Sequence, residues 1–370
     1  IKKIKDLISE ETLIPSSHIF IHNIHTHSAP IMDGMGLTEN LANKSYEEIT
    51  TIAITSNAIS TINNKQGFKS CQIKVGTGKS TIGLHRRTIE ASTGQCIISS
   101  KNKTPNDPVV SVLQFVDQKE NILATIINYA CHPVSLGPES FKVSPDFVGK
   151  TRETIEEKWG GLVAFFNGAA GDINPIGDPL NDLNNTDKLG DLLGNSVLET
   201  SFKHVPVECL SFQNDLAKLP FQIQHISQKI IQEQATKKKE EHTGFVGWKE
   251  KIDDWSNQQQ KYLSKDKFLG REVQLNVLKM GSILLIICQG ELFSSYHIAF
   301  RNMFPEYTVF FFGYTNGESG YLPDQQAFDI GGYEVEQAYV FFNEPSPLAP
   351  SADGILKNAI SDLVNNVIKS

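Results

Sequence analysis

The sequence is poor in cysteine, in basic charge and in long apolar runs, and each shortage argues against a class of protein. Its 370 residues include five cysteines, and no two of them form a CxxC pair. The chain is therefore not a disulfide framework, and its scattered thiols are typical of a reducing compartment. No apolar run approaches the ~20 residues of a membrane span. The net charge of −8 gives no electrostatic reason to expect a nucleic-acid partner.

The bulk composition is that of an ordinary globular protein. Hydrophobic residues make up 39% and charged residues 21% of a chain long enough for one or two domains. No signal peptide is visible, although the chain begins with Ile1 and not with Met. These features favour a cytoplasmic location, and a secreted protein stays open if a leader is missing from this chain.

Short apolar runs alternate with helical patterns along the chain. Runs rich in β-branched and aromatic residues predict buried strands at 19–24, 122–130, 162–166, 283–288 and 307–314. Apolar residues at helical spacing predict helices at 46–62, 147–159 and 354–368. This alternation predicts an α/β fold, a mixed layered sheet flanked by helices.

Residues 223–263 differ in composition from their surroundings. They are rich in Gln, Lys and Glu, with the sequence ATKKKEEH near their centre. We expect one or two solvated helices here, inserted into the domain as a flap or cap. A basic partner-binding patch is the weaker alternative, because acidic residues are interleaved with the lysines.

The stretch VGTGKST at 75–81 resembles a phosphate-binding loop but does not satisfy its pattern. That pattern needs a glycine at position 73, where this chain has Ile73. An extended stretch, IGLHRR, follows where a helix would be needed. We therefore exclude nucleotide binding here and expect a tight glycine turn between two strands.

Three histidines fall within six residues in IHNIHTHSAP, at 21–30. If 19–24 is a strand that ends before Pro30, then His25 and His27 share one face and His22 points to the other. Two imidazoles on one face at a strand end could bind a metal. The alternative is that both are bonded to backbone groups near a turn.

Polar residues also follow the other predicted strands. The residues concerned are His132, Asn174, Glu291 and Tyr321. Ligands bind beyond strand ends in open sheets, so these side chains are expected at one site. Two histidines and one carboxylate form a catalytic zinc set that leaves a position for water, and Zn²⁺ suits hydrolysis at neutral pH.

Each of these residues also has a structural interpretation. His132 precedes Pro133 and could be a loop histidine bonded to the backbone. Glu291 could be the acidic first-turn residue of a helix formed by LFSSYHIAFRNMF. Tyr321 and Tyr333 could be packing residues. Only their shared placement at strand ends favours a common site.

Five motifs together resemble one known family. HTHSAP, NYACHP, NGAAGDINP, QGELF and NGESGYLPDQQAFDIGGYE are similar, in order and spacing, to the catalytic domain of the neutral/alkaline ceramidases. The resemblance runs from about residue 19 to the C-terminus, and it implies one catalytic domain over residues 1–370. Members of that family are zinc amidases that cleave ceramide to a sphingoid base and a fatty acid.

The resemblance also implies roles for individual residues. It implies that zinc is bound by His25, His132, Glu291 and Tyr321. It further implies that the metal and the reacting carbonyl are lined by His27, Arg86 and Tyr333. By this resemblance His22, on the other face of the predicted strand, is a structural residue.

Three departures separate this chain from the family pattern. Asn174 stands where the ceramidases carry a serine assigned to catalysis, and an amide cannot accept an acyl group as a nucleophile. The family's C-terminal immunoglobulin-like domain is absent from the 370 residues. The strands expected before HTHS are missing or lie outside this chain.

The sequence therefore predicts a zinc-dependent amidohydrolase of ceramidase type, acting on a small-molecule or lipid N-acyl substrate. Because Asn174 replaces the family serine, a different and soluble amide, ester or lactone is the main alternative. A non-catalytic binding protein with a relic site is a third reading, and the intact set of predicted ligands argues against it.

Overall fold

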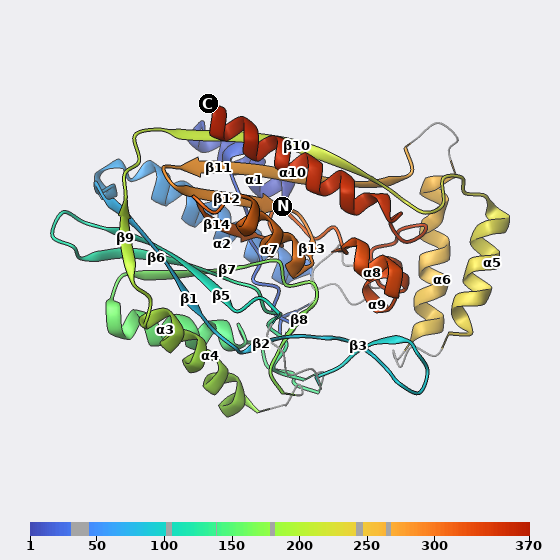
Figure 1. Ribbon diagram of the computed structural model, residues 1–370. Helices are drawn as coiled ribbons and strands as arrows, with labels where there is room; N and C mark the ends of the chain where they lie inside the picture. The colour runs from blue at the N-terminus through green and yellow to red at the C-terminus, as the bar shows by residue number, and fades with distance from the viewer. Residues whose placement is uncertain (31–43, 101–105, 138, 178–181, 242–246, 264–267) are drawn as a thin grey trace.

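The computed structural model describes residues 1–30, 44–100, 106–137, 139–177, 182–241, 247–263 and 268–370 (Figure 1). Two mixed sheets form its centre, and helices cover their outer faces. This is the mixed layered α/β architecture that the alternating sequence pattern predicts, so the fold class is confirmed. Among the described residues, no helix combines the length and the apolar character needed to cross a membrane.

The first sheet has the strand order β7–β6–β5–β1–β9, in which only the β6–β7 pair is parallel. Its strands are β1 (Gln72–Lys79), β5 (Val109–Val116), β6 (Ile122–Tyr129), β7 (Leu162–Asn167) and β9 (Phe202–Val205). The second sheet has the order β10–β11–β12–β14, in which only β12–β14 is parallel. Its strands are β10 (Leu210–Pro220), β11 (Gly270–Met280), β12 (Ile283–Cys288) and β14 (Thr308–Phe312).

Three two-stranded pairs lie beyond these sheets and carry much of the site. They are β2 (Gly83–His85) with β8 (Ile173–Pro175), β3 (Arg87–Ile89) with β4 (Cys96–Ile98), and β13 (Glu291–Leu292) with β15 (Tyr321–Leu322). The β13–β15 pair is parallel, and it sets Glu291 opposite Tyr321.

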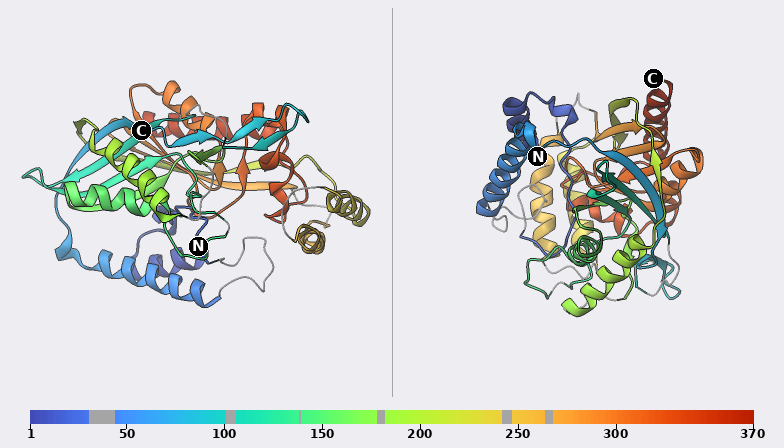
Figure 2. Two further views of the ribbon diagram at one scale, coloured as in Figure 1. Left: turned by 90° about the horizontal axis from the view of Figure 1, so that it is seen from below. Right: turned by 90° about the vertical axis from the view of Figure 1, so that its left-hand side faces the viewer.

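The α-helices are α1 (Lys2–Thr12), α2 (Lys44–Asn63), α3 (Phe147–Trp159), α4 (Leu183–Leu198), α5 (Gln228–Lys239), α6 (Trp248–Gln258), α7 (Ser294–Met303), α8 (Gln325–Ile330), α9 (Tyr333–Glu336) and α10 (Ser351–Lys369). Short 3₁₀ segments occur at η1 (Ser16–His18), η3 (Lys65–Gly67), η4 (Gln259–Tyr262) and η5 (Ala338–Val340). Helices α1 and α2 pack together along one side of the layers (Figure 2).

Three of the clusters of buried side chains lie between the layers. Val75, Leu113, Leu285 and Phe310 belong to the cluster shared by the two sheets. A second cluster joins α3 and α4 to the first sheet, and a third joins α7 and α10 to the second sheet. The order of layers is therefore helix, sheet, sheet, helix, and burying apolar area on both faces of each sheet is its main stabilisation.

Two sequence predictions are wrong. Residues 19–24 do not form a strand: the segment makes one isolated bridge, His22 with Thr315, and His25 adopts a left-handed backbone with φ 61°. An extended run cannot continue through a residue with that backbone conformation.

The glycine-rich stretch at 75–81 is also not a turn, because most of it lies inside β1. A Cβ at Gly76 would stand 2.4 Å from the carbonyl oxygen of Ser201. A Cβ at Gly78 would stand 2.9 Å from that of Ser196. These glycines let β1 pass close to the end of α4. A strand at this position is also consistent with our exclusion of a phosphate-binding loop.

Helices α5 and α6 fall in the polar segment predicted at about 223–263, and they lie at the edge of the molecule beside α8 and α9 (Figure 1). They are not solvated on all sides. Trp248 and Trp255 are buried against Tyr339 and Val340, and Trp255 Nε1 donates to Glu344 O at 2.6 Å. The insertion is thus anchored to the chain just beyond Tyr333.

Candidate metal centre

The site forms where strands of both sheets end. His132 follows β6, Glu291 follows β12, and Tyr314 follows β14. Backbone hydrogen bonds join these segments: His132 N donates to Ile173 O at 3.0 Å and Tyr314 N donates to Gly290 O at 3.1 Å. Because each parallel pair ends at a common edge, the polar residues after the strands converge.

Two imidazoles and one carboxylate meet at spacings that suit a single ion. Glu291 Oε2 lies 3.0 Å from His132 Nε2 and 3.6 Å from His25 Nε2. Ligands at about 2.0–2.1 Å around a tetrahedral zinc lie roughly 3.3 Å apart. The ring of His27 is also close, and one ligand atom each from His25, His27 and His132 can be chosen within 4.8 Å of one another. This histidine group could hold a metal.

Each histidine is oriented by a different contact. His132 Nδ1 lies 2.7 Å from Ala170 O, and because a carbonyl can only accept, Nδ1 is the protonated nitrogen and Nε2 is left for a ligand. The ring of His25 lies against Tyr314, with centroids 4.6 Å apart. His22 accepts from Asn167 N through Nε2 and contacts Thr315 through Nδ1, so both its nitrogens are used within the fold.

The surroundings disfavour charge on the three histidines, of which His132 is buried, His25 half-buried and His27 exposed. Desolvation lowers the pKa of His25 to about 3, and it also lowers the pKa of His27. Burial, together with Arg86, holds the pKa of His132 well below its usual range. At neutral pH all three rings are therefore in the neutral form that metals bind.

The pKa values of some acidic groups nearby are shifted upward. Burial and the neighbouring Glu291 raise the pKa of Glu318 well above its usual range. Burial also raises the pKa of Tyr321 well above that of a free phenol, and the pKa of Tyr333 to about 12. A cation between these groups would offset the repulsion among them, so the donor set fits a divalent ion.

Arg86 reaches into the same cluster. Its Nη1 lies 3.3 Å from both His132 Nε2 and Asn174 Oδ1, and its guanidinium stands 5.3 Å from the centre of the Tyr321 ring. Its Nε donates to Glu334 Oε1 at 2.8 Å. Burial opposes the charge, but Tyr321 and Glu334 hold the pKa of Arg86 well above its ordinary value. Among the described residues, its buried Nη2 has no hydrogen-bond partner.

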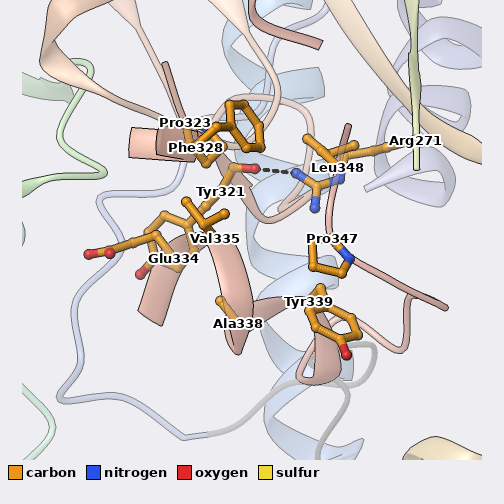
Figure 3. A pocket seen from close by; sticks show the side chains of 10 residues that line it. All are labelled: Arg271, Tyr321, Pro323, Phe328, Glu334, Val335, Ala338, Tyr339, Pro347 and Leu348. Atoms are coloured by element: carbon orange, nitrogen blue, oxygen red, sulfur yellow. Dashed lines mark hydrogen bonds between the residues drawn. The ribbon is translucent and has the colours of Figure 1, made fainter. Parts of the chain in front are cut away.

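The two tyrosines complete the arrangement. Tyr321 and Tyr333 have ring centroids 5.8 Å apart at an interplanar angle of 72°. The carbonyl of Tyr321 accepts from Arg271 at a pocket that Tyr321 and Glu334 also line (Figure 3). That pocket has a volume of about 10 Å³, which suits one water and no substrate.

A larger opening lies beside Asn174. It has a volume of about 170 Å³ and is lined mainly by Ile98, Val134, Asn174 and Pro175. Its lining residue Asn174 also contacts Arg86, which in turn contacts His132 of the histidine cluster.

The structure brings all the predicted site residues into one neighbourhood. They are His25, His27, Arg86, His132, Asn174, Glu291, Tyr321 and Tyr333. Sequence reasoning missed Tyr314, Glu318 and Glu334. Glu318 and Glu334 stand inside the motif NGESGYLPDQQAFDIGGYE, but no spacing rule marks them as site residues.

The molecule is thus a mixed α/β layered fold with a candidate metal centre at its strand ends, and this is the fold of the neutral ceramidases. It is similar to a structure described as neutral ceramidase from Pseudomonas aeruginosa, with a TM-score of 0.65 and 16% identity over 98% of this chain and 64% of that chain. It is also similar to a structure described as ceramidase complexed with C2, with a TM-score of 0.66 and 16% identity over 99% of this chain and 66% of that chain.

These likenesses establish the fold, and the chain spans slightly less than two thirds of the length of either solved structure. No family model matches the sequence, and no curated protein matches it by sequence comparison.

Proposed function

We propose that the protein is a zinc-dependent hydrolase that cleaves an N-acyl amide bond, as the resemblance to ceramidases implies. The observation that carries the proposal is the buried Nη2 of Arg86, which has no hydrogen-bond partner among the described residues, on a guanidinium whose Nη1 lies 3.3 Å from His132 Nε2. A buried donor without a partner costs about 1–3 kcal/mol, which a substrate oxygen would recover.

His25, His132, Glu291 and Tyr321 would hold the zinc, which when bound supplies Lewis-acid chemistry and activates water. The remaining residues have separate roles. Arg86 Nη2 donates to the substrate carbonyl oxygen and the Tyr333 hydroxyl supports the same oxygen as negative charge develops. His27 carries a proton to the departing amine, and Asn174 orients the acyl group by hydrogen bonding.

A second candidate keeps the centre and changes the substrate to a smaller, soluble amide, ester or lactone. Asn174 replaces the family serine, and the opening beside it has a volume of about 170 Å³. A cavity of about 150 Å³ accommodates benzene, so this opening suits a short apolar arm. The apolar side chains of Ile98, Val134 and Pro175 fit such an arm.

Metal analysis and a substrate panel test the proposal. We expect one zinc per chain, loss of hydrolysis after dialysis against a chelator, and recovery when zinc is restored. The panel pairs ceramides with short N-acyl amides, and the preferred length separates the two candidates. Purified protein that binds no zinc and hydrolyses no member of the panel would refute the proposal and favour a non-catalytic binding protein.

Replacing Tyr333 tests the stabilisation of the carbonyl oxygen. Tyr333→Phe is expected to lower kcat by ~10²–10³, because one donor to the developing charge is lost. Asn174→Ala should lower kcat less, since Asn174 orients the substrate and accepts no acyl group. The measurement is kcat at saturating zinc, with Tyr307→Phe, at the far end of β14, as the matched control. Equal losses in Asn174→Ala and Tyr333→Phe would contradict these roles, as would a covalent acyl-enzyme trapped in a single turnover.

A further inference from the structure

We propose that Glu318 is a positioning residue, whose carboxylate holds His25 so that Nε2 faces the metal centre. This inference rests on the metal centre of the proposed function. Its starting point is the placement of the His25 ring between two carboxylates, one at each nitrogen. Nδ1 lies 3.9 Å from Glu318 Oε2, and Nε2 lies 3.6 Å from Glu291 Oε2.

The carboxylate of Glu318 is fixed by the backbone around it. Its Oε1 accepts from Gly320 N at 2.8 Å, which leaves Oε2 directed to His25. Gly320 has φ 83°, a conformation that favours glycine, and its carbonyl accepts from Glu291 N at 3.0 Å. Glu318 is thereby tied to the strand that carries Glu291.

His25 needs such a partner more than His132 does. His132 is oriented by the backbone carbonyl of Ala170, whereas no hydrogen bond to either ring nitrogen of His25 occurs within the described residues. A neutral imidazole has one N–H, and an acceptor at Nδ1 places that proton away from the ligating nitrogen. Histidines that bind metals donate their other N–H to a carboxylate or carbonyl in this way.

The distance between His25 Nδ1 and Glu318 Oε2 is consistent with a contact that shortens when the metal binds. At 3.9 Å the pair is beyond hydrogen-bond length. Hydrogen bonds at a catalytic site are often long before ligands bind and shorten afterwards. The His25 ring lies against Tyr314 at an interplanar angle of 34°, and a rotation about its side-chain bonds is the movement that would bring Nδ1 toward Oε2.

Zinc affinity and imidazole protonation test the proposal without measuring turnover. Glu318→Gln keeps an oxygen for Gly320 N but removes the charge, and Glu318→Ala removes both. Zinc affinity should fall by about 10–100-fold in Glu318→Ala and by less in Glu318→Gln. In ¹⁵N spectra of the zinc-loaded protein, where the bound cation keeps Glu318 ionised, His25 should bind through Nε2 and carry its proton on Nδ1 in the parent, and it should lose that single arrangement in Glu318→Ala. Comparison with His25→Gln assigns its signals.

Two controls separate positioning from a structural role. Glu156→Gln changes a carboxylate that also accepts a backbone N–H, from Val163 at the opposite end of β7, and its zinc affinity should equal that of the parent. The zinc-free Glu318→Gln variant should melt no lower than the parent, because it relieves repulsion with Glu291. Unchanged zinc affinity in Glu318→Ala, or an unchanged His25 tautomer, would overturn the inference. A parent that binds no zinc would refute the metal centre itself.

Discussion

Glu291→Gln is expected to reduce hydrolysis to the uncatalysed rate while the protein stays folded. The side chain is 3% exposed, and Oε2 is the atom shared by His25 and His132. Glutamine preserves the volume but brings a neutral amide where the proposed ion needs a charged oxygen. The loss should therefore appear in kcat and in bound zinc. The measurements are turnover at saturating zinc, metal content and the urea midpoint.

The matched control for this substitution is Glu272→Gln. Glu272 lies on β11 with half of its side chain exposed and pairs only loosely with Lys218, at 3.7 Å. Its replacement should leave turnover and zinc content unchanged. If Glu291→Gln retained parental turnover with a full complement of metal, Glu291 would not be a ligand.

The second substitution with a large expected effect acts on the stability of the fold. Glu334→Ala is expected to lower the free energy of unfolding by about 3–5 kcal/mol, as for a buried ion pair that loses one partner. The carboxylate of Glu334 is almost fully buried and accepts from both Arg86 and Arg87. Without it, two buried guanidinium groups lose their shared counter-ion. Urea denaturation measures the change, and Glu272→Ala should show little.

The pH dependence of the same group has a definite sign. Burial opposes the charge of Glu334, but Arg86 and Arg87 hold its pKa below the ordinary value of 4.5. Its contribution is therefore fully present above pH 4.5 and is lost as the pH falls through the lower folded-state pKa. The parent should lose stability in that range more steeply than Glu334→Gln, which has no carboxyl to titrate. Parallel curves for the two proteins would contradict the role of Glu334.

Much of the fold can be predicted from the sequence, because a short run of strongly apolar residues indicates a buried strand directly. All six residues of β12 are buried, and its run of aliphatic residues predicts this directly. The segment at 19–24 has an equally strand-like composition, yet it makes a single bridge. The two segments differ in the backbone that follows them, because His25 has a left-handed conformation. Contacts with Tyr314 and Glu291, which are distant in the sequence, accompany that conformation, and no local sequence pattern predicts it.

The residues of the candidate site also divide into those that the sequence predicts and those that are found only in the folded structure. Residues that follow strands, such as His132 and Glu291, can be selected from the sequence because strand ends are visible in it. Glu318 and Glu334 act through partners far away in the chain: Glu334 meets Arg86 across 248 residues. No spacing rule reaches across such a separation, so these acids are identified only when the fold is known.

The separations within the centre also fix when it can form during synthesis. His132 and Glu291 are 159 residues apart, and Tyr321 stands later still, on the strand that pairs with that of Glu291. A growing chain that has released its histidines from the ribosome still lacks the oxygen donors. Since long-range contacts are also slow to close, the proposed centre can form only after Tyr321 has emerged. Binding of the proposed metal would therefore follow the pairing of β13 with β15 and would not precede it.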